Sequence, residues 1–241
     1  SAGHDLIHAA RYGTKPIKAI HQKDYVNFLE TAWLAWKDLP DSGDEIIPNV
    51  HPGRNMNASP NSIISLSGHY QADTACPIGE GTYEGIIASS DVAVSGAYAI
   101  MDDIKNRNKE SYAYSLCRPP GHHAFADQAG GFCFFNNSAI AAQVCLDNGA
   151  SRIAILDIDV HHGNGTQGIF YHRSDVFTIS LHGDPFFYYP FFAGYADEIG
   201  SDEGTEYNLN YPLPRGTNDE NYLKVLNEAV DKVTIYQPDV L

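Results

Sequence analysis

Apolar runs alternate with amphipathic segments through the second half of the chain. Five of the six positions in 153–158 are apolar, which is typical of a strand buried on both faces of a parallel sheet. Residues 176–181 predict the following strand, and a helical segment at about 165–171 separates the two. A helix at 138–148 precedes them, with Gly149 just past its end. Because strands that alternate with helices form parallel sheets covered on both faces, we expect an α/β fold.

The first half of the chain predicts helices and one long irregular segment. Asp24 is positioned to cap a helix that continues to about Trp36, and a second helix is expected over 84–106. A strand is expected at 111–117. Residues 39–62 are rich in Pro, Asn, Asp, Ser and Gly and show no period. They predict a long loop of the kind that is usually functional or disordered.

The end of the chain predicts a final helix and the start of a strand. Thr217 and Glu220 form a capping-box pattern, and apolar residues then follow at helical spacing. Residues 238–241 resemble the opening of another buried strand. The sequence contains no internal repeat and no linker, so its 241 residues suit one large α/β domain.

Composition limits the classes of partner. The chain carries 30 acidic and 15 basic residues, and the resulting net charge of −15 disfavours nucleic acid, whose phosphates would be repelled. The same charge is compatible with attraction of a cationic substrate or with a generic acidic surface. No apolar run approaches the roughly 18 residues needed to span a bilayer, so we expect no membrane partner.

The cysteines indicate a reducing compartment. Cys76, Cys117, Cys133 and Cys145 show no CxxC spacing, which favours buried thiols over a metal site or a redox motif. Thiols persist in compartments kept reduced. We therefore expect a cytoplasmic protein.

The run that ends the first predicted strand has the pattern of a metal site. Asp157, Asp159 and His161 would be costly to bury at a strand end unless a partner satisfied them. Asp159 and His161 lie two positions apart and project from the same face of an extended chain, so one divalent cation could take both. The alternative is a hydrogen-bonded strand end without a metal.

A second polar group lies upstream, at His122 and His123. Both follow Pro-Pro-Gly, and proline stiffens the backbone of their loop. Two neutral imidazoles close to a metal-bound water could supply the general base and the general acid of a hydrolysis. Asp157 and Asn164 are available to fix their tautomers. The alternative is a pair of surface histidines without a shared function.

An aromatic segment follows the second predicted strand. Residues 186–192 are aromatic at every position except Pro190, so no helix or strand period can turn all of them inward. They pack over the core or, because pockets of parallel sheets lie beyond strand ends, form a wall around a ligand. We expect some of them to project outward and to form a homodimer over the substrate channel. Tyr189 is the residue expected to contact the substrate.

Four ordered motifs resemble the histone deacetylase superfamily, in its branch of bacterial acetylpolyamine amidohydrolases. They are 118–124 (RPPGHHA), 130–137 (GGFCFFNN), 157–165 (DIDVHHGNG) and 180–185 (SLHGDP). The resemblance covers most of the chain. It implies an arginase-like fold, a three-layer α/β/α sandwich around a parallel sheet. It also implies that residues 1–241 are a single deacetylase-like catalytic domain, incomplete at its C-terminal end.

The resemblance implies a zinc site and the place of its missing parts. Asp159 and His161 are similar to two of the family's three zinc ligands. The third ligand, an Asp, and a Tyr that stabilises the transition state are expected beyond Leu241. Asp184 is only a poor substitute for that third ligand.

The resemblance also implies catalytic, channel and potassium residues. His122 and His123 are similar to the family's tandem histidines, partnered by Asp157 and Asn164, with His123 as general base and acid. The channel residues are matched by Gly131 and Phe132. The family's structural potassium site is matched, mostly through oxygens, by Asp157, Asp159, His161, Ser180 and Leu181.

The leading hypothesis is a zinc-dependent amidohydrolase that removes an acetyl group from a primary amine such as an acetylpolyamine or acetyl-lysine. Residues 62–67 contain no carboxylate, so a polyamine ammonium finds no counter-ion there. Another acylated amine or an acyl-lysine is therefore the alternative substrate. Two other functions remain open: a non-catalytic acyl-amine-binding fragment, and a manganese ureohydrolase of the arginase type. The latter needs a DAHxD-like run, and residues 159–163 read DVHHG instead.

Overall fold

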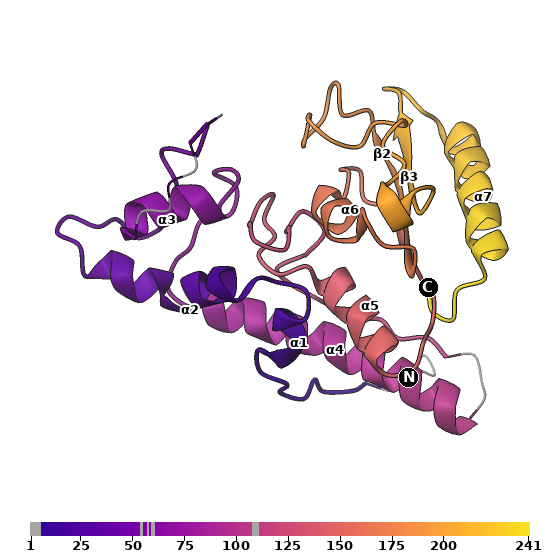
Figure 1. Cartoon of the computed structure of the whole chain (residues 1–241), viewed down its shortest axis with the longest axis horizontal. Coiled ribbons are helices and arrows are strands. Elements are labelled where there is room, and N and C mark those ends of the chain that lie inside the picture. The colour runs from indigo at the N-terminus through magenta and orange to yellow at the C-terminus, as the bar shows by residue number, and fades with distance from the viewer. Residues whose placement is uncertain (1–5, 54, 57, 59–60, 108–110) are drawn as a thin grey trace.

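The computed structural model describes residues 6–53, 55–56, 58, 61–107 and 111–241. In chain order the elements are α1 (Lys15–Lys18), α2 (Lys23–Lys37), α3 (Ile63–Tyr70), α4 (Thr82–Arg107), α5 (Asn137–Asp147), β1 (Ile153–Asp157), α6 (Asn164–Phe170), β2 (Val176–Gly183), the 3-10 helix η1 (Asp202–Gly204), β3 (Asn208–Leu213) and α7 (Asp219–Tyr236). Figure 1 shows α2 and α3 at the opposite end of the molecule from the strands.

The sheet is parallel throughout, with strand order β1-β2-β3. Asp157 pairs with Ser180 in the register of β1 and β2, and Thr178 pairs with Asn208 in that of β2 and β3. Parallel neighbours need a crossover connection, and α6 supplies it between β1 and β2. The central strand β2 is buried along nearly its whole length. The expected α/β fold with a parallel sheet is therefore confirmed.

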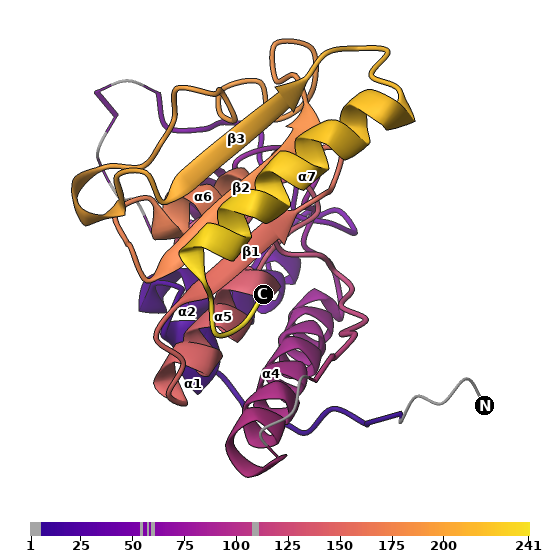
Figure 2. The ribbon, with the colours of Figure 1, turned by 90° about the vertical axis from the view of Figure 1, so that its right-hand side faces the viewer.

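Helices cover both faces of the sheet, with α7 on one face and α5 and α6 on the other (Figure 2). Alternate side chains of a strand project to opposite faces. Phe177, Ile179 and Leu181 of β2 pack in one apolar cluster with Ala229 and Val233 of α7. The expected three-layer α/β/α sandwich is present.

The opposite face of β2 is polar. Thr178, Ser180 and His182 alternate with the apolar residues and project toward α6, where all three are buried. Thr178 Oγ1 donates to Asn208 Oδ1 at 2.6 Å, and Ser180 Oγ lies 2.8 Å from Nδ1 of His182. This alternation brings polar groups into the interior directly behind the candidate site.

Strand β1 lies at the edge of the sheet and is less buried than its apolar sequence predicts. Its last three residues are half-buried, and Ile158 beyond them is 61% exposed. On the edge away from β2, Val240 forms a parallel bridge with Ile153, and its carbonyl accepts the N–H of Ala154 at 3.0 Å. The expected strand opening at 238–241 is present as this single bridge.

Residues 111–117 do not form the expected strand. They make no regular strand ladder, and Tyr112 and Tyr114 are each 89% exposed, with Leu116 at 71%. Strand propensity depends on packing against a half-buried surface. These side chains face solvent instead, so the prediction of a strand was wrong.

Two predicted helix starts also differ. The N-cap of α7 is Asn218, whose Oδ1 accepts the N–H of Asn221 at 3.0 Å. Thr217 instead bonds a carbonyl of the preceding turn. Asn is at least as good a cap as Thr, so the boundary moves by one residue. Gln22 occupies the N-cap position of α2 without a side-chain capping bond, and Asp24 lies in the first turn, where a negative charge suits the helix dipole.

The other predicted elements agree with the structure. Helices α4, α5 and α6 and strand β2 confirm what the hydrophobic pattern indicates. The described residues of 39–62 contain no helix or strand beyond one antiparallel bridge between Ile46 and Ile78. Residues 54, 57, 59 and 60 of this loop lie outside the described part of the chain.

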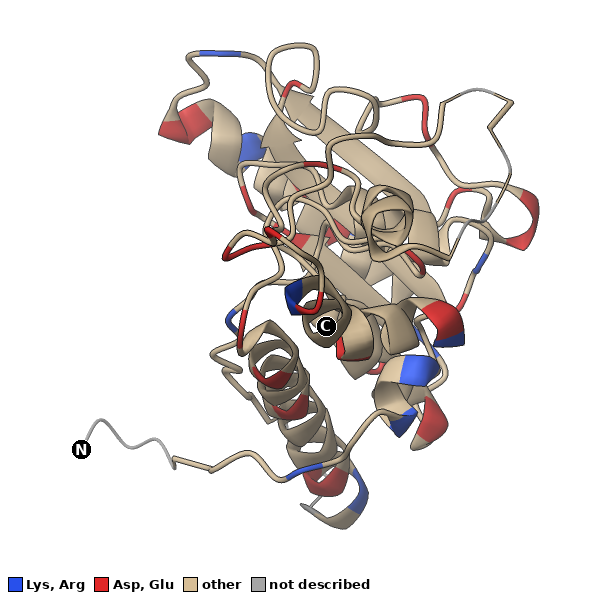
Figure 3. Cartoon of the chain, turned by 90° about the vertical axis from the view of Figure 1, so that its left-hand side faces the viewer, with Lys and Arg blue, Asp and Glu red and all other residues tan. Residues whose placement is uncertain are grey.

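The surface and the thiols are consistent with the composition. The four cysteines are free, and Cys76, Cys133 and Cys145 are buried. Within the part of the chain that the structure describes, no helix is long and apolar enough to cross a membrane. Acidic positions are spread over helices and loops on the side shown in Figure 3.

Replacing Gly165 by Ala should lower the free energy of unfolding by about 2 kcal/mol or more, because the added Cβ would overlap the backbone of Ala124 at the start of α6. Gly85→Ala is the matched control, since its Cβ meets nothing within 4 Å in α4. That variant should be unchanged or more stable by up to about 1 kcal/mol. Urea unfolding measures both, and equal effects would contradict the packing role of Gly165.

Candidate active site

The candidate site lies at the carboxyl end of β1, where pockets of parallel sheets form. The chain leaves the strand through two consecutive Asx turns. Asp157 Oδ1 accepts the N–H of Asp159 at 3.0 Å, and Asp159 Oδ1 accepts that of His161 at 2.8 Å. Helix α6 follows, and the N–H of Thr166 donates to the carbonyl of His122 at 3.1 Å. The D-x-D-x-H spacing therefore shapes the loop as well as supplying its functional groups.

The loops of the site approach so closely that glycine is required. A Cβ at Gly163 would overlap the carboxylate of Asp157 and lie 3.3 Å from Nδ1 of His122. A Cβ at Gly165 would overlap the carbonyl of Ala124. Neither glycine has a positive φ. Space, rather than backbone conformation, selects glycine at both positions.

The surroundings of His122 favour its positively charged form. Its Nδ1 donates to Oδ2 of Asp157 at 2.8 Å, and each side chain is 16% exposed. Burial disfavours the charged form of His122, but the bond to Asp157 and its negative charge outweigh burial, so the pKa of His122 is raised. Burial likewise opposes ionisation of Asp157, yet the hydrogen bond from His122 lowers its pKa. The two form an ion pair.

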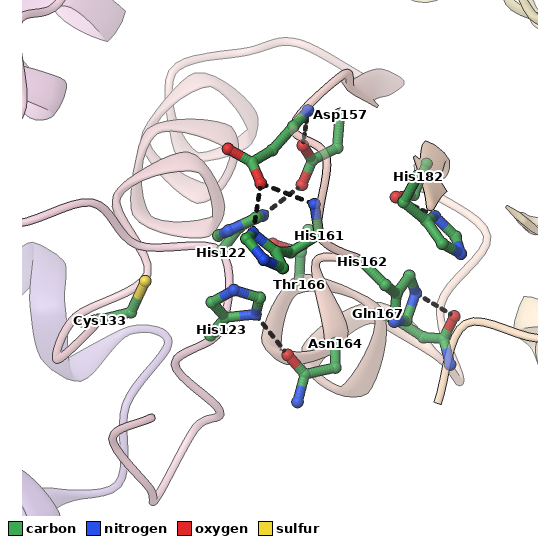
Figure 4. Close-up of polar contacts among 12 residues, drawn as sticks. His122, His123, Cys133, Asp157, His161, His162, Asn164, Thr166, Gln167 and His182 are labelled. Atoms are coloured by element: carbon green, nitrogen blue, oxygen red, sulfur yellow. Dashed lines mark hydrogen bonds and ion pairs between the residues drawn. The ribbon is translucent and has the colours of Figure 1, made fainter. Parts of the chain in front are cut away.

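His123 is held neutral beside it. Its Nδ1 lies 2.8 Å from Oδ1 of Asn164, an amide oxygen that accepts the ring N–H and leaves Nε2 with a lone pair. Burial, and then the positive charge of His122, lower the pKa of His123 to about 4. The two ring centroids are 3.9 Å apart, and Figure 4 shows the rings gathered with that of His161. Both partnerships expected from the sequence are present.

The three residues expected to line a channel lie on two loops. Tyr189 stands edge-on to His123, with ring centroids 4.8 Å apart, and 6.1 Å from the ring of His161. A Cβ at Gly131 would overlap the ring of His123, and its φ of +50° also requires glycine. Phe132 follows with φ +69° and is 66% exposed. Gly131 and Tyr189 therefore flank His123, whereas Phe132 lies at the surface.

A buried polar network supports the loop from behind. His162 donates to Gln167 Oε1 at 3.1 Å, and Gln167 donates to Glu198 at 2.6 Å. His182 donates to the carbonyl of Gly194 at 2.8 Å. Burial and the neighbouring His182 lower the pKa of His162 to about 3, so it stays neutral.

We assigned no role to this network from the sequence. In the sequence, this network is indicated only by the second histidine of the pair at 161–162 and by the polar residues at alternate positions of β2. The network consists of His162, Gln167, His182, Gly194 and Glu198.

The family model described as histone deacetylase domain matches residues 2–241. The chain belongs to the histone deacetylase family. It is 46% identical over 231 residues to acetylpolyamine amidohydrolase 2 of Pseudomonas aeruginosa, covering 95% of this chain and 65% of the relative. It is 42% identical over 237 residues to the acetylpolyamine amidohydrolase of Mycoplana ramosa, covering 98% and 68%.

Solved structures of the histone deacetylase family agree with this assignment. The crystal structure of acetylpolyamine aminohydrolase from Burkholderia pseudomallei superposes with a TM-score of 0.91 at 40% identity, covering 99% of this chain and 68% of that one. These matches confirm the resemblance and the fold. The chain spans about two thirds of the length of the relatives it matches.

The two residues that the resemblance matches to zinc ligands carry donor atoms suited to that ion. Asp159 Oδ1 and His161 Nδ1 lie 3.2 Å apart, and their side chains are 51% and 42% exposed, so both are open to a ligand. A carboxylate and an imidazole are donors that zinc takes. Among the described residues no group of three His, Cys, Asp or Glu side chains converges on one point. Asp184 Oδ1 accepts the N–H of Phe186 at 2.9 Å.

The residues matched to a potassium site have oxygens suited to a hard cation. Asp157 and Ser180 face each other in the register of β1 and β2, and Leu181 is the next residue along β2. Asp159 and His161 follow Asp157 through the two Asx turns. Their side-chain and backbone oxygens thus come from the end of β1, the loop after it and the neighbouring part of β2.

Replacing Asp157 by Asn should lower the pKa of His122, because the hydrogen-bonded carboxylate is lost and only the charge of Asp159 then opposes burial. The reciprocal change, Asn164→Asp, should raise the pKa of His123 above about 4. NMR titration of the imidazole nitrogens measures both values. An unchanged pKa of His122 in the Asn variant would mean that Asp157 does not set its charge.

Proposed function

We propose that residues 1–241 form a catalytic domain of a zinc-dependent amidohydrolase that removes an acetyl group from a primary amine. The observation that carries the proposal is the pair of adjacent imidazoles whose pKa values are shifted in opposite directions, His122 bonded to Asp157 and His123 to Asn164. The acetylpolyamine amidohydrolases among its relatives support the same reaction class.

Different residues of the chain have different roles in the proposed hydrolysis. Zinc held by Asp159 and His161 would polarise the acyl oxygen and lower the pKa of a bound water. Neutral His123 takes a proton from the attacking water at Nε2 and passes it to the leaving amine nitrogen. Positively charged His122 stabilises the negative charge that develops on the acyl oxygen.

The substrate we propose is a slim acetylated amine, either an acetylpolyamine or an acetyl-lysine. The excess of 30 acidic over 15 basic residues favours approach of a cationic amine. Potassium bound through the oxygens near Asp157 and Ser180 would brace the loop that carries the zinc ligands. The free cysteines support a cytoplasmic location.

The direct test is an assay of the complete gene product on acetylated diamines and acetyl-lysine. We expect release of acetate that stops with a zinc chelator and returns when zinc is added back. Activity that resists the chelator would overturn the zinc mechanism. No hydrolysis of any acetylated amine by the zinc-loaded protein would overturn the function.

His123→Ala should reduce turnover at least about a hundredfold with zinc retained, because it removes the general base and acid. His161→Ala is the paired variant, and it should lose zinc because a ligand nitrogen is gone. Activity assays with metal analysis separate the two roles. Equal loss of zinc in both variants would make His123 a ligand.

The aromatic segment supports a homodimer that narrows the entrance to the site. Phe186 and Phe192 are 72% and 93% exposed, and exposed apolar patches mark interfaces or ligand grooves. Sedimentation should give a dimer that prefers acetylated small amines to acetylated histone peptide. Phe192→Ser should weaken the dimer, whereas Leu116→Ser, at a site 71% exposed elsewhere, should not. A monomer that prefers the peptide would contradict this proposal.

A further inference from the structure

Asp73 lies in the loop after α3 and uses both of its carboxylate oxygens inside the protein. Its Oδ2 accepts the hydroxyl of Tyr189 at 2.7 Å and the N–H of Gly131 at 3.1 Å. Its Oδ1 accepts the N–H of Ala75 at 2.8 Å and the thiol of Cys76 at 3.8 Å. A single half-buried carboxylate therefore accepts hydrogen bonds from four groups.

The two groups on Oδ2 come from separate parts of the chain. Gly131 is 58 positions and Tyr189 116 positions from Asp73 in the sequence. Both flank His123: the ring of Tyr189 stands edge-on at 4.8 Å between centroids, and a Cβ at Gly131 would overlap the imidazole. Asp73 thus ties the two walls beside the proposed general base to one atom.

The hydrogen bond from Tyr189 to Asp73 is suited to hold the phenol ring in place. Hydrogen bonds to a charged acceptor are shorter and stronger than neutral ones, and 2.7 Å lies in their range. Burial and the hydrogen bond to Asp73 both raise the pKa of Tyr189, so the phenol keeps its proton. A Phe at this position would have the same ring without an anchor.

Packing around this hydrogen bond leaves little room for the ring of Tyr189 to move. A Cβ at Gly130 would lie 3.3 Å from the hydroxyl of Tyr189 and 3.4 Å from Oδ2 of Asp73. A Cβ at Gly131 would lie 3.0 Å from the ring itself. The distance between the 130–131 backbone and the ring of Tyr189 therefore depends on the carboxylate that both share.

We propose that Asp73 is a positioning residue that sets the width of the acyl-amine channel by anchoring Tyr189 and the backbone of Gly131. The proposal rests on the proposed function and names its specificity device. Asp73 does not touch the substrate, because its oxygens are already occupied by protein donors. It selects substrates through the walls that it fixes.

The test compares two substrates of the zinc-loaded gene product. One is N-acetyl-1,5-diaminopentane, and the other is its 2-methyl analogue acetylated on N1, the nitrogen nearest the methyl branch. One methyl group in a tight channel discriminates by about tenfold or more in kcat/KM. Asp73→Ala and Tyr189→Phe should each reduce that preference at least about fivefold. The double variant should reduce it no further than Asp73→Ala alone, because both act through one bond.

Two controls exclude other roles of Asp73. Tyr195→Phe removes a phenol that bonds the carbonyl of Phe191 in the same aromatic segment, and it should leave the preference unchanged. Acetylated 1-aminopentane, which carries no ammonium, tests direct charge recognition. If Asp73 were a counter-ion, Asp73→Ala would weaken only the cationic substrates, and the proposal would be overturned.

A measurement without substrate separates this proposal from the proposed function. Urea unfolding of the same variants should show coupling, with Tyr189→Phe shifting the midpoint less in the Asp73→Ala background than in the parent protein. Coupling without hydrolysis of either substrate would reject the function and the channel role while keeping the anchor. Independent shifts, or an unchanged preference in an active Asp73→Ala variant, would overturn the anchor itself.

Discussion

A carboxylate at the last position of β1 organises the candidate site. Asp157 bonds His122 through one oxygen and the N–H of Asp159 through the other, so the same side chain fixes a charged imidazole and starts the loop that carries the proposed zinc ligands. Its place in the sheet is opposite Ser180 of the central strand β2. Removing one partner of a fully buried ion pair leaves an uncompensated charge. The loss lowers the free energy of unfolding by about 3–5 kcal/mol.

The pKa values of two histidines in contact are shifted in opposite directions because their partners differ. Asp157 offers a charge to His122, whereas Asn164 offers only an amide oxygen to His123. The positive charge on the first ring further disfavours protonation of the second. An imidazole whose pKa is lowered to about 4 and one whose pKa is raised thus stand 3.9 Å apart between ring centroids. This division of charge is what a hydrolytic amidase needs from two otherwise identical side chains.

The parts of the molecule that follow local rules could be predicted from the sequence. The apolar run before Asp157 predicted β1, and the spacing of Asp159 and His161 predicted their common side because strand and turn geometry act over a few residues. Strand β3 was missed because its sequence NLNYPL has no apolar run, and its burial comes from pairing with β2. The strand expected at 111–117 is absent for the opposite reason, because its large apolar and aromatic side chains face solvent and no surface buries them.

Long-range contacts explain what the sequence could not predict in the site. Asp73 meets Gly131 and Tyr189 only through the fold, and no local pattern marks it. The buried network behind the loop likewise depends on β2 turning His182 toward Gly194. By contrast, the partners of His122 and His123 were accessible because their motifs are short and ordered. The resemblance to a family predicted which residue partners each histidine, and the geometry of the site indicates how each partner shifts the pKa of its histidine.

The most direct test of this account is NMR titration of the imidazole nitrogens in the metal-free protein. We expect His122 to titrate above 6.5, held by Asp157, and His123 to remain neutral down to about pH 4. The nitrogen shifts should also place the proton of neutral His123 on Nδ1, toward Asn164. Two histidines that titrate together near 6.5, or a His123 that is the more basic of the two, would contradict the division of charge on which the proposed mechanism depends.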